Sequence, residues 1–320
     1  MIVCKFGGSS TTTAKALQNI ERISHKKCRK IFVFSALGKA SENDEKITDL
    51  LIDFCVATNN EEKNKIIKKI KLKFDKLINL THVNIEFSAI FKNISKTKNK
   101  NYIISRGEYL TSQIMAQFLG IKFVPAEQIF CLRNDEVDFD LTKKKIEKFL
   151  ARYGRICTGG FYGYDVETKK IVLFERGGGD ISGAILAKCL NAKVYENFTD
   201  VSGVKMANPK YVPTAKTIKK LSYKQMKILS QCDGKVLHER VCEMLDGTKT
   251  KTIVANTFSP NDCKTCIDSK HHKAKFVCFR YIGNMAEVLK AVGEKKETIL
   301  CNKTDLKQTL LQEYHKFDRR

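Results

Sequence analysis

Residues 173–209 read LFERGGGDISGAILAKCLNAKVYENFTDVSGVKMANP and contain the most informative local pattern of the chain. A basic residue, three glycines and an acid come before a helix-like run, as Arg176, Gly177, Gly178, Gly179 and Asp180. Glycines between a strand and a helix let backbone N–H groups approach an anion closely, because no Cβ intrudes and the helix dipole favours negative charge. The stretch therefore predicts a site for an anionic ligand.

Apolar runs that predict strands alternate with helix-like segments around this stretch. Strands are expected over residues 2–6 and 30–34, with a helix over 13–25 between them. The alternation predicts an α/β fold, in which an open, mostly parallel twisted sheet carries helices on both faces. Ligands bind at the carboxyl ends of the strands in such sheets, and segments 5–8 and 35–38 both fall there.

The chain is long enough for one large α/β domain and a smaller element, with 320 residues of which 42% are hydrophobic. The smaller element is expected at the C-terminal end. Strands over 276–281 and 297–301 and helices over 285–292 and 306–315 would form a short α+β appendage.

Composition excludes several classes of protein. No apolar segment reaches the roughly 18 residues of a membrane span, and no signal-peptide pattern precedes residues 2–6, so we expect a cytoplasmic protein. An amphipathic helix over 60–80 is expected on the surface, with membrane binding as the lesser alternative. The formal net charge of +23 comes mainly from dispersed lysines. We therefore expect no nucleic-acid partner and a surface field that favours anionic substrates.

The twelve cysteines are scattered, so we expect most of them to be reduced and buried in a reducing compartment. One group resembles a metal site: Cys263 and Cys266 are followed by His271, His272 and Cys278, all ligand types that zinc accepts. A single CxxC with irregular downstream spacing is weaker evidence than two. We expect free thiols and no bound metal, and zinc stays the alternative.

Three glycines alone would also fit a tight strand-to-helix turn, but other segments accompany them. KFGGSS at 5–10 ends the first apolar run, SRGEYL at 105–110 opens a helix, and GKVLH at 234–238 lies further on. In this order and spacing the segments resemble the aspartate kinases of the amino acid kinase family. The resemblance extends from residue 1 to about residue 268.

The resemblance implies a division of the chain into two domains. Residues 1–268 would form the catalytic domain, whose N-terminal part binds the amino acid and whose C-terminal part binds the nucleotide. Residues 269–320 are too few for the pair of ACT modules that commonly follows this domain, so a vestigial half module is expected. Such a half could pair with another protomer, which leaves a homodimer open.

The resemblance also implies roles for individual residues. Lys5 would neutralise charge on the transferring phosphoryl group, and Asp180 would hold that lysine in place. Glu108 would pair with the substrate ammonium group and Arg176 with its α-carboxylate. The substrate side would comprise Ser35, Thr48, Glu108, Arg176, Gly177, Gly178 and Gly179, and the nucleotide side Lys5, Phe6, Gly7, Gly8, Ser9, Thr199, Asp200, Lys205, Lys210, Lys235 and Val236.

The implied reaction transfers the γ-phosphoryl group of ATP to the side-chain carboxylate of L-aspartate, with Mg²⁺ bridging the ATP phosphates. It is the first step towards lysine and diaminopimelate, threonine and methionine. No general base is needed, because the acceptor carboxylate is already ionised at neutral pH. The chain has neither GxxxxGK[ST] nor the HRD and DFG motifs, which argues against P-loop and protein kinases.

The chain departs from the family pattern at several positions. Glu175 replaces the usual glycine before the arginine, Gly179 a serine, and Lys205 a tyrosine. Asn208 and Lys210 replace the aspartate and arginine of Ala-Asp-Pro-Arg, which keeps a cation but loses its bidentate geometry.

Two alternatives to aspartate kinase activity stay open. A relative could phosphorylate another small carboxylate, carbamate or phosphate acceptor, although Glu108 with Arg176 favours a zwitterionic amino acid. The chain could also be a catalytically weak binding or regulatory paralogue, against which Lys5, Asp180 and Glu108 argue.

Overall fold

The structure is a computed structural model that describes residues 1–175 and 177–318. It divides into two compact units, Met1–Asp200 and Val201–Arg320. The second unit therefore contains the end of the expected catalytic domain together with the appendage, and the domain boundary near residue 268 stays a prediction. Among the described residues, no helix has both the length and the apolar character that crossing a membrane requires.

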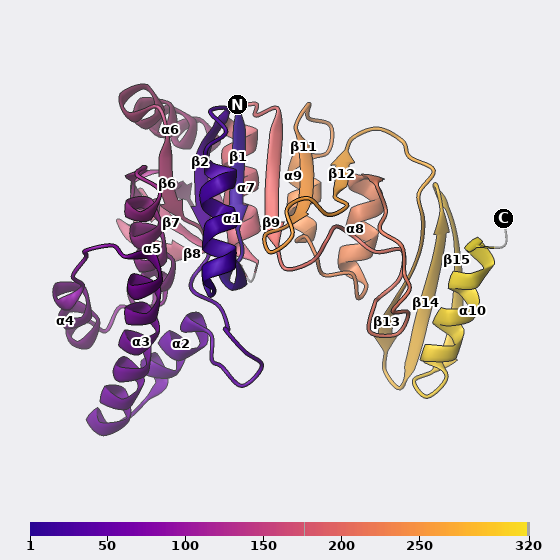
Figure 1. Cartoon of the computed structure of the whole chain (residues 1–320), viewed down its shortest axis with the longest axis horizontal. Coiled ribbons are helices and arrows are strands. Elements are labelled where there is room, and N and C mark those ends of the chain that lie inside the picture. The colour runs from indigo at the N-terminus through magenta and orange to yellow at the C-terminus, as the bar shows by residue number, and fades with distance from the viewer. Residues whose placement is uncertain (176, 319–320) are drawn as a thin grey trace. The chain divides into compact units, whose positions relative to one another are not determined.

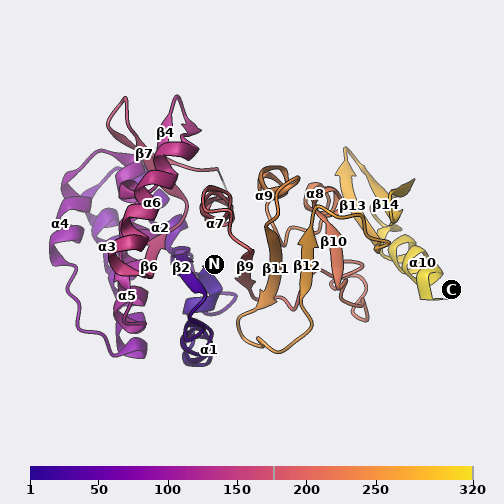
Figure 2. The ribbon, with the colours of Figure 1, turned by 90° about the horizontal axis from the view of Figure 1, so that it is seen from above.

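A parallel sheet forms the centre of the first unit. Its strand order is β9-β1-β2-β6-β3, and all four pairs of neighbours are parallel. Figure 2 shows α6 and α7 on one face of this sheet and α1 and α5 on the other. The strands are β1 (Ile2–Phe6), β2 (Arg29–Phe34), β3 (Lys122–Phe123), β6 (Ile156–Gly159) and β9 (Val194–Thr199), and the four helices are α1 (Ala14–Ser24), α5 (Lys100–Phe118), α6 (Phe139–Tyr153) and α7 (Gly178–Cys189).

Several of the remaining elements of the first unit, among them α2, α3 and β8, pack against α5. Helix α3 is the expected amphipathic helix, and Asn59 caps it by accepting a hydrogen bond from the Glu62 N–H. A smaller sheet has the order β5-β4-β7-β8. These elements are η1 (Gly8–Thr11), α2 (Ile47–Val56), α3 (Asn60–Thr81), α4 (Ser88–Lys96), η2 (Ala126–Gln128), β4 (Cys131–Arg133), β5 (Glu136–Val137), β7 (Tyr162–Asp165) and β8 (Lys170–Leu173).

In the second unit, helices α8 and α9 come between strands β10 and β11 in the chain, and an antiparallel sheet follows β12. Strands β10, β12 and β11 are neighbours in that order, and a meander β13-β14-β15 follows with α10 packed against it (Figure 1). The predicted α/β class with a small C-terminal appendage is confirmed. The elements are β10 (Lys220–Ser222), α8 (Tyr223–Gln231), α9 (Glu239–Leu245), β11 (Lys251–Asn256), β12 (Thr265–Asp268), β13 (Lys275–Ile282), β14 (Met285–Val292), β15 (Lys295–Asn302) and α10 (Leu306–Asp318).

The helix predicted over 285–292 is wrong, because this segment is strand β14. Its alanine, leucine, glutamate and lysine residues favour a helix, but the turns at its ends prevent one. Gly283 and Gly293 have φ values of 56° and 63°, which suit two-residue hairpin turns. All eight residues of β14 pair with β13 and with β15, so the turn chemistry outweighs the local propensity.

Candidate active site

Lys5 and Asp180 form an ion pair where β1 ends and α7 begins. The distance from Lys5 Nζ to Asp180 Oδ1 is 2.6 Å, and the two side chains are 10% and 15% exposed. Because β1 and β2 are parallel, the loops that follow them meet at the same edge of the sheet. Phe6 fixes that edge by stacking between Phe34 and Phe198, with ring centroids 5.0 and 4.9 Å apart.

The glycine turn before α7 lies tightly against these strand ends. Gly177 has a φ of 84°, in the left-handed region that favours glycine. A Cβ on Gly179 would lie 2.6 Å from Ser35 Oγ and 3.2 Å from Lys5 Cε. Gly179, Ser35, Lys5 and Asp180 therefore form one cluster. The roles expected of these residues stay predictions. Arg176 lies outside the described residues.

Two further glycines allow the loops after β1 and β2 to touch through their backbones. The Gly38 N–H donates to the Gly8 carbonyl at 3.0 Å, and a Cβ on either residue would come within 2.6 Å of the opposite loop. The Gly7 N–H donates to the Phe198 carbonyl at 3.0 Å, so it is occupied here and is not free for an anion. Ser9 lies in η1, next to these contacts.

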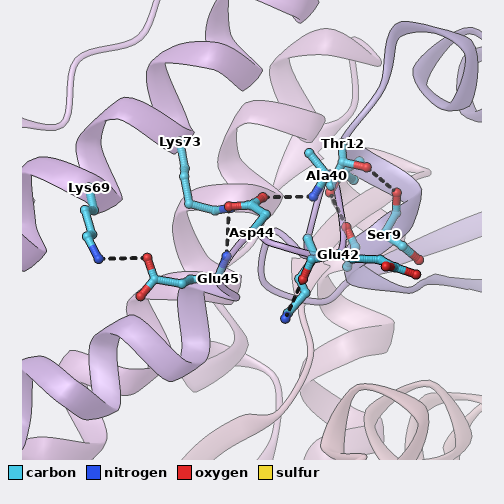
Figure 3. Close-up of polar contacts among 11 residues, drawn as sticks. Ser9, Thr12, Ala40, Glu42, Asp44, Glu45, Lys69 and Lys73 are labelled. Atoms are coloured by element: carbon cyan, nitrogen blue, oxygen red, sulfur yellow. Dashed lines mark hydrogen bonds and ion pairs between the residues drawn. The ribbon is translucent and has the colours of Figure 1, made fainter.

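The loop that leads from β2 to α2 is tied to α3 (Figure 3). Asp44 accepts hydrogen bonds from the Ala40 N–H at 2.8 Å and from Lys73 Nζ at 2.5 Å, and it has a pKa lowered to about 2. Burial would raise the pKa of Asp44, but these hydrogen bonds and the charge of Lys73 outweigh that effect. Lys69 contacts Glu45 at 2.9 Å. These contacts fix the loop between Ser35 and the first turn of α2, which contains Thr48.

Glu108 lies buried in α5, with 4% of its surface exposed. Burial raises its pKa to about 8, although the Ala36 N–H donates to the carboxylate and Arg106 opposes the shift. Glu108 Oε2 has no hydrogen-bond partner in the part of the chain that the structure describes. A Cβ on Gly159 would lie 3.1 Å from Glu108 Cβ, so the missing side chain lets α5 approach β6 closely. A cationic group beside Glu108 would favour its ionised form.

The residues expected on the nucleotide side are divided between the two units. Thr199 ends β9, and its hydroxyl contacts Asp200 Oδ1 at 3.1 Å. In the second unit Lys205 Nζ donates to Thr217 Oγ1 at 2.7 Å, and Lys210 lies in the turn after Ala207. The loop that follows α8 holds the remaining two, Lys235 and Val236.

Asn208 has a clear structural function in that turn. Its side-chain oxygen accepts the Lys210 N–H at 2.9 Å, and its carbonyl accepts the N–H groups of Tyr211 and Val212. The amide therefore closes the turn as an aspartate would, because the same oxygen is available to accept a hydrogen bond.

The cysteine and histidine residues weighed for zinc do not gather into one site. Among the described residues, no group of three or more His, Cys, Asp or Glu side chains is placed to hold a metal ion. Cys263 is exposed, and His272 Nε2 lies 2.8 Å from Asp268 Oδ1.

Sequence reasoning missed two polar residues that lie close to these groups. Asn197 is 1% exposed and is paired in register with Lys5, and its Oδ1 lacks a hydrogen-bond partner within the described residues. Arg106 is 3% exposed and precedes Glu108 by two residues. The parallel alignment of β9 with β1 could have indicated Asn197.

An open α/β sheet with a lysine, an acid and glycine turns at its strand ends is typical of proteins that bind an anionic ligand at that edge. The sequence profile of the amino acid kinase family matches residues 1–256, and the chain belongs to that family. The resemblance inferred from the motifs is thereby confirmed.

Relatives of this chain include several aspartokinases. It is 28% identical over 291 residues to aspartokinase 3 of Bacillus subtilis, covering 84% of this chain and 64% of that protein. It is 28% identical over 303 residues to the bifunctional aspartokinase/homoserine dehydrogenase of Buchnera aphidicola, covering 83% of this chain and 36% of that protein. The chain thus spans less than two thirds of the length of either relative.

Two solved structures share the fold. Aspartate kinase of Clostridium acetobutylicum superposes with a TM-score of 0.85 at 22% identity, covering 98% of this chain and 99% of the other. Aspartokinase III of E. coli, in complex with aspartate and ADP, gives a TM-score of 0.76 at 18% identity, covering 88% of this chain and 68% of the other.

Proposed function

We propose that this chain transfers the γ-phosphoryl group of ATP to the side-chain carboxylate of L-aspartate, giving ADP and 4-phospho-L-aspartate. The observation that carries the proposal is the pairing of Lys5 with Asp180 at 2.6 Å, in a unit that also buries Glu108, whose Oε2 lacks a hydrogen-bond partner among the described residues. The names of the relatives, aspartokinases in both cases, support the same reaction.

Lys5 acts on the phosphoryl group in this proposal. Its ammonium group neutralises the negative charge that develops on the equatorial oxygens, and Asp180 holds it at the end of β1. The N–H groups of Gly8 and Ser9, at the start of η1, supply further donors. The acceptor carboxylate attacks directly, since it is ionised at neutral pH.

Glu108 and Arg176 bind the amino acid in this proposal. Glu108 Oε2, which has no partner among the residues that the structure describes, receives the ammonium group, and Arg176 receives the α-carboxylate in a bidentate pair. Aspartate fits better than a carboxylic acid that lacks the amino group, because a substrate without an ammonium group would leave the buried carboxylate unpaired.

Mg²⁺ enters as part of the nucleotide complex. It is usually held by the phosphates and one or two carboxylates rather than by a cage of side chains. The exposed carboxylate of Asp200, at the end of β9, fits that requirement. The ion would neutralise phosphate charge, and this chain's own residues would orient the two substrates.

A hydroxamate assay tests the proposal. The purified chain is incubated with ATP, Mg²⁺, hydroxylamine and a panel of amino acids, with Lys5→Ala as the control. We expect aspartyl hydroxamate from the unmodified chain and a rate at least about 100-fold lower from the variant. A faster rate with glutamate would identify another acceptor, and no acyl phosphate with any amino acid would refute the kinase assignment.

A further inference from the structure

Phe161 has a backbone conformation that its side chain disfavours. Its φ is 73°, in the left-handed region, where a bulky residue is an outlier. The residue lies in the short connection between β6 and β7, where a glycine would adopt this conformation without strain. Strained residues persist only where their surroundings hold them, and they cluster at functional sites. The contacts of Phe161 therefore bear on the site beside it.

The backbone of Phe161 is bonded to the chain that leads into α7. Its N–H donates to Ser182 Oγ at 2.9 Å and to the Gly178 carbonyl at 3.3 Å. Its carbonyl accepts the N–H of Phe174 at 2.7 Å. Phe161 thus contacts this chain both before the glycine turn (residues 177–179) and within it.

Ser182 completes the connection between Phe161 and the glycine turn. Its side chain is 0% exposed, and its hydroxyl donates to the Gly178 carbonyl at 2.7 Å while it accepts the Phe161 N–H. A hydroxyl can donate and accept at the same time, so one buried side chain satisfies both groups. An alanine at this position would leave both hydrogen bonds unmade.

The connection between β6 and β7 also packs directly against the glycine turn. A Cβ on Gly178 would lie 2.7 Å from Phe161 Cδ2, and a Cβ on Gly160 would lie 2.9 Å from Gly179 Cα. On its other side the turn meets the loop after β2, since a Cβ on Gly179 would lie 2.6 Å from Ser35 Oγ. The glycine turn is therefore held between Phe161 and Ser35, with no space for a shift towards either.

We propose that Phe161 and Ser182 are positioning residues that hold the glycine turn against Ser35 and so set the affinity for the acceptor. The effect on the acceptor rests on the proposed function, whereas the positioning itself does not depend on turnover. Asp180 has contacts of its own, with Lys5 Nζ at 2.6 Å and, through its carbonyl, with Tyr195 Oη at 3.1 Å. Loss of the Ser182 hydroxyl should therefore weaken acceptor binding more than phosphoryl transfer.

Hydrogen–deuterium exchange of the ligand-free full chain, read by mass spectrometry of its peptides, tests the positioning. In Ser182→Ala, peptides that contain Phe161 or Gly178 are expected to exchange about tenfold faster, because two hydrogen bonds are lost there. Peptides from α1 and β2 should keep their rates. Ser95→Ala is the matched control, since Ser95 Oγ also donates to the carbonyl four residues earlier, at 3.0 Å, but in α4. Equal acceleration in every peptide, or none at Phe161 and Gly178, would overturn the proposal.

The variant Phe161→Gly separates positioning from a purely structural role. Glycine accepts the positive φ without strain and removes only the ring that lies against Gly178. Its urea midpoint is expected to exceed that of Phe161→Ala, which lacks the ring but keeps the strain. KM for aspartate is nevertheless expected to rise about fivefold in Phe161→Gly. An unchanged KM for aspartate would overturn the proposal, and this variant keeps the test decisive if Ser182→Ala does not fold.

Steady-state kinetics of Ser182→Ala separate this inference from the proposed function. We expect KM for aspartate to rise about tenfold, with kcat changed less than about threefold and KM for ATP unchanged. Equal changes in KM for both substrates would indicate general loosening of the fold and overturn the inference. If the unmodified chain forms no aspartyl phosphate, the proposed function fails, and the exchange rates still determine whether Ser182 holds the glycine turn.

Discussion

The change in the free energy of unfolding caused by Glu108→Gln is expected to be more favourable at pH 8.5 than at pH 5. Burial raises the pKa of this carboxyl group to about 8, compared with an ordinary value of 4.5. Between pH 4.5 and about pH 8 the unfolded chain has released a proton that the folded chain retains. The free energy of unfolding therefore falls as pH rises through this range. At about 1.4 kcal/mol per pH unit, the full loss is about 5 kcal/mol.

Glutamine removes this loss while keeping the shape of the side chain. Its amide oxygen can accept the hydrogen bond that Ala36 donates to Glu108. Its amide nitrogen introduces donors beside an oxygen position that has no partner among the described residues, at a cost of about 1–3 kcal/mol. That cost is the same at both pH values, so the pH dependence isolates the ionisation of Glu108.

Urea unfolding followed by far-UV circular dichroism at pH 5, 7 and 8.5 measures the effect. The unmodified chain, Glu108→Gln and a control at an exposed acid, Glu86→Gln, are compared. The stability difference between Glu108→Gln and the unmodified chain is expected to move in favour of the variant by about 4 kcal/mol from pH 5 to pH 8.5. Parallel pH dependences for these two proteins would refute the reasoning.

Four further predictions follow from the same groups. The affinity for aspartate should increase as pH rises from 6 to 8, because Glu108 must lose its proton when aspartate binds. Calorimetry in several buffers at pH 7 should detect the release of about one proton per aspartate bound, and no release would contradict this prediction. Lys5→Met should lower kcat at least about 100-fold in steady-state assays and change KM for ATP less than about fivefold; equal effects on both would count against its role. Gly179→Ala should lower kcat about tenfold by displacing Ser35, and adding Ser35→Ala should recover part of the rate; no recovery would exclude the clash as the cause. Asp44→Asn should lower the free energy of unfolding at pH 7 by about 1 kcal/mol, because the pKa of Asp44 is lowered to about 2 in the folded chain. In urea unfolding this loss should shrink as pH falls from 4 to 2.5. A loss that stays constant would show that the charge of Asp44 is not its cause.

The parallel sheet and the convergence at its edge could be predicted because both depend on local patterns. Apolar runs separated by helical segments indicate parallel strands, and the loops after such strands must meet. Lys5 and Ser35 were therefore expected at the same edge, and a Cβ on Gly179 would lie against both of them. The family resemblance implied that Asp180 lies beside Lys5, and the two side chains form an ion pair. The wrong prediction of a helix over 285–292, where the structure has β14, also has a local cause. Gly283 and Gly293 mark two hairpin turns that outweigh the helix-forming residues between them.

The environment of Glu108 could not be predicted in the same way. Its burial depends on Gly107 and Gly159, which let α5 approach the loop after β2 and the end of β6. Those contacts join residues about fifty to seventy positions apart, and no local pattern indicates them. The aromatic rings around Arg106, those of Tyr102, Tyr109 and Tyr162, are an intermediate case. Tyr102 and Tyr109 follow helical spacing on either side of the arginine, whereas Tyr162 comes from β7.

Two of the departures from the family pattern can be explained from contacts in the structure. Gly179 stands where the aspartate kinase pattern has a serine, and in this chain Ser35 Oγ occupies the space that a side chain there would need, 2.6 Å from the Cβ position. Asn208 keeps the hydrogen bond that closes its turn. Both substitutions preserve the local backbone and remove a functional group near it. Under the proposed function, they should therefore alter the rate and the nucleotide contacts more than the choice of acceptor, which is assigned to Glu108 and Arg176.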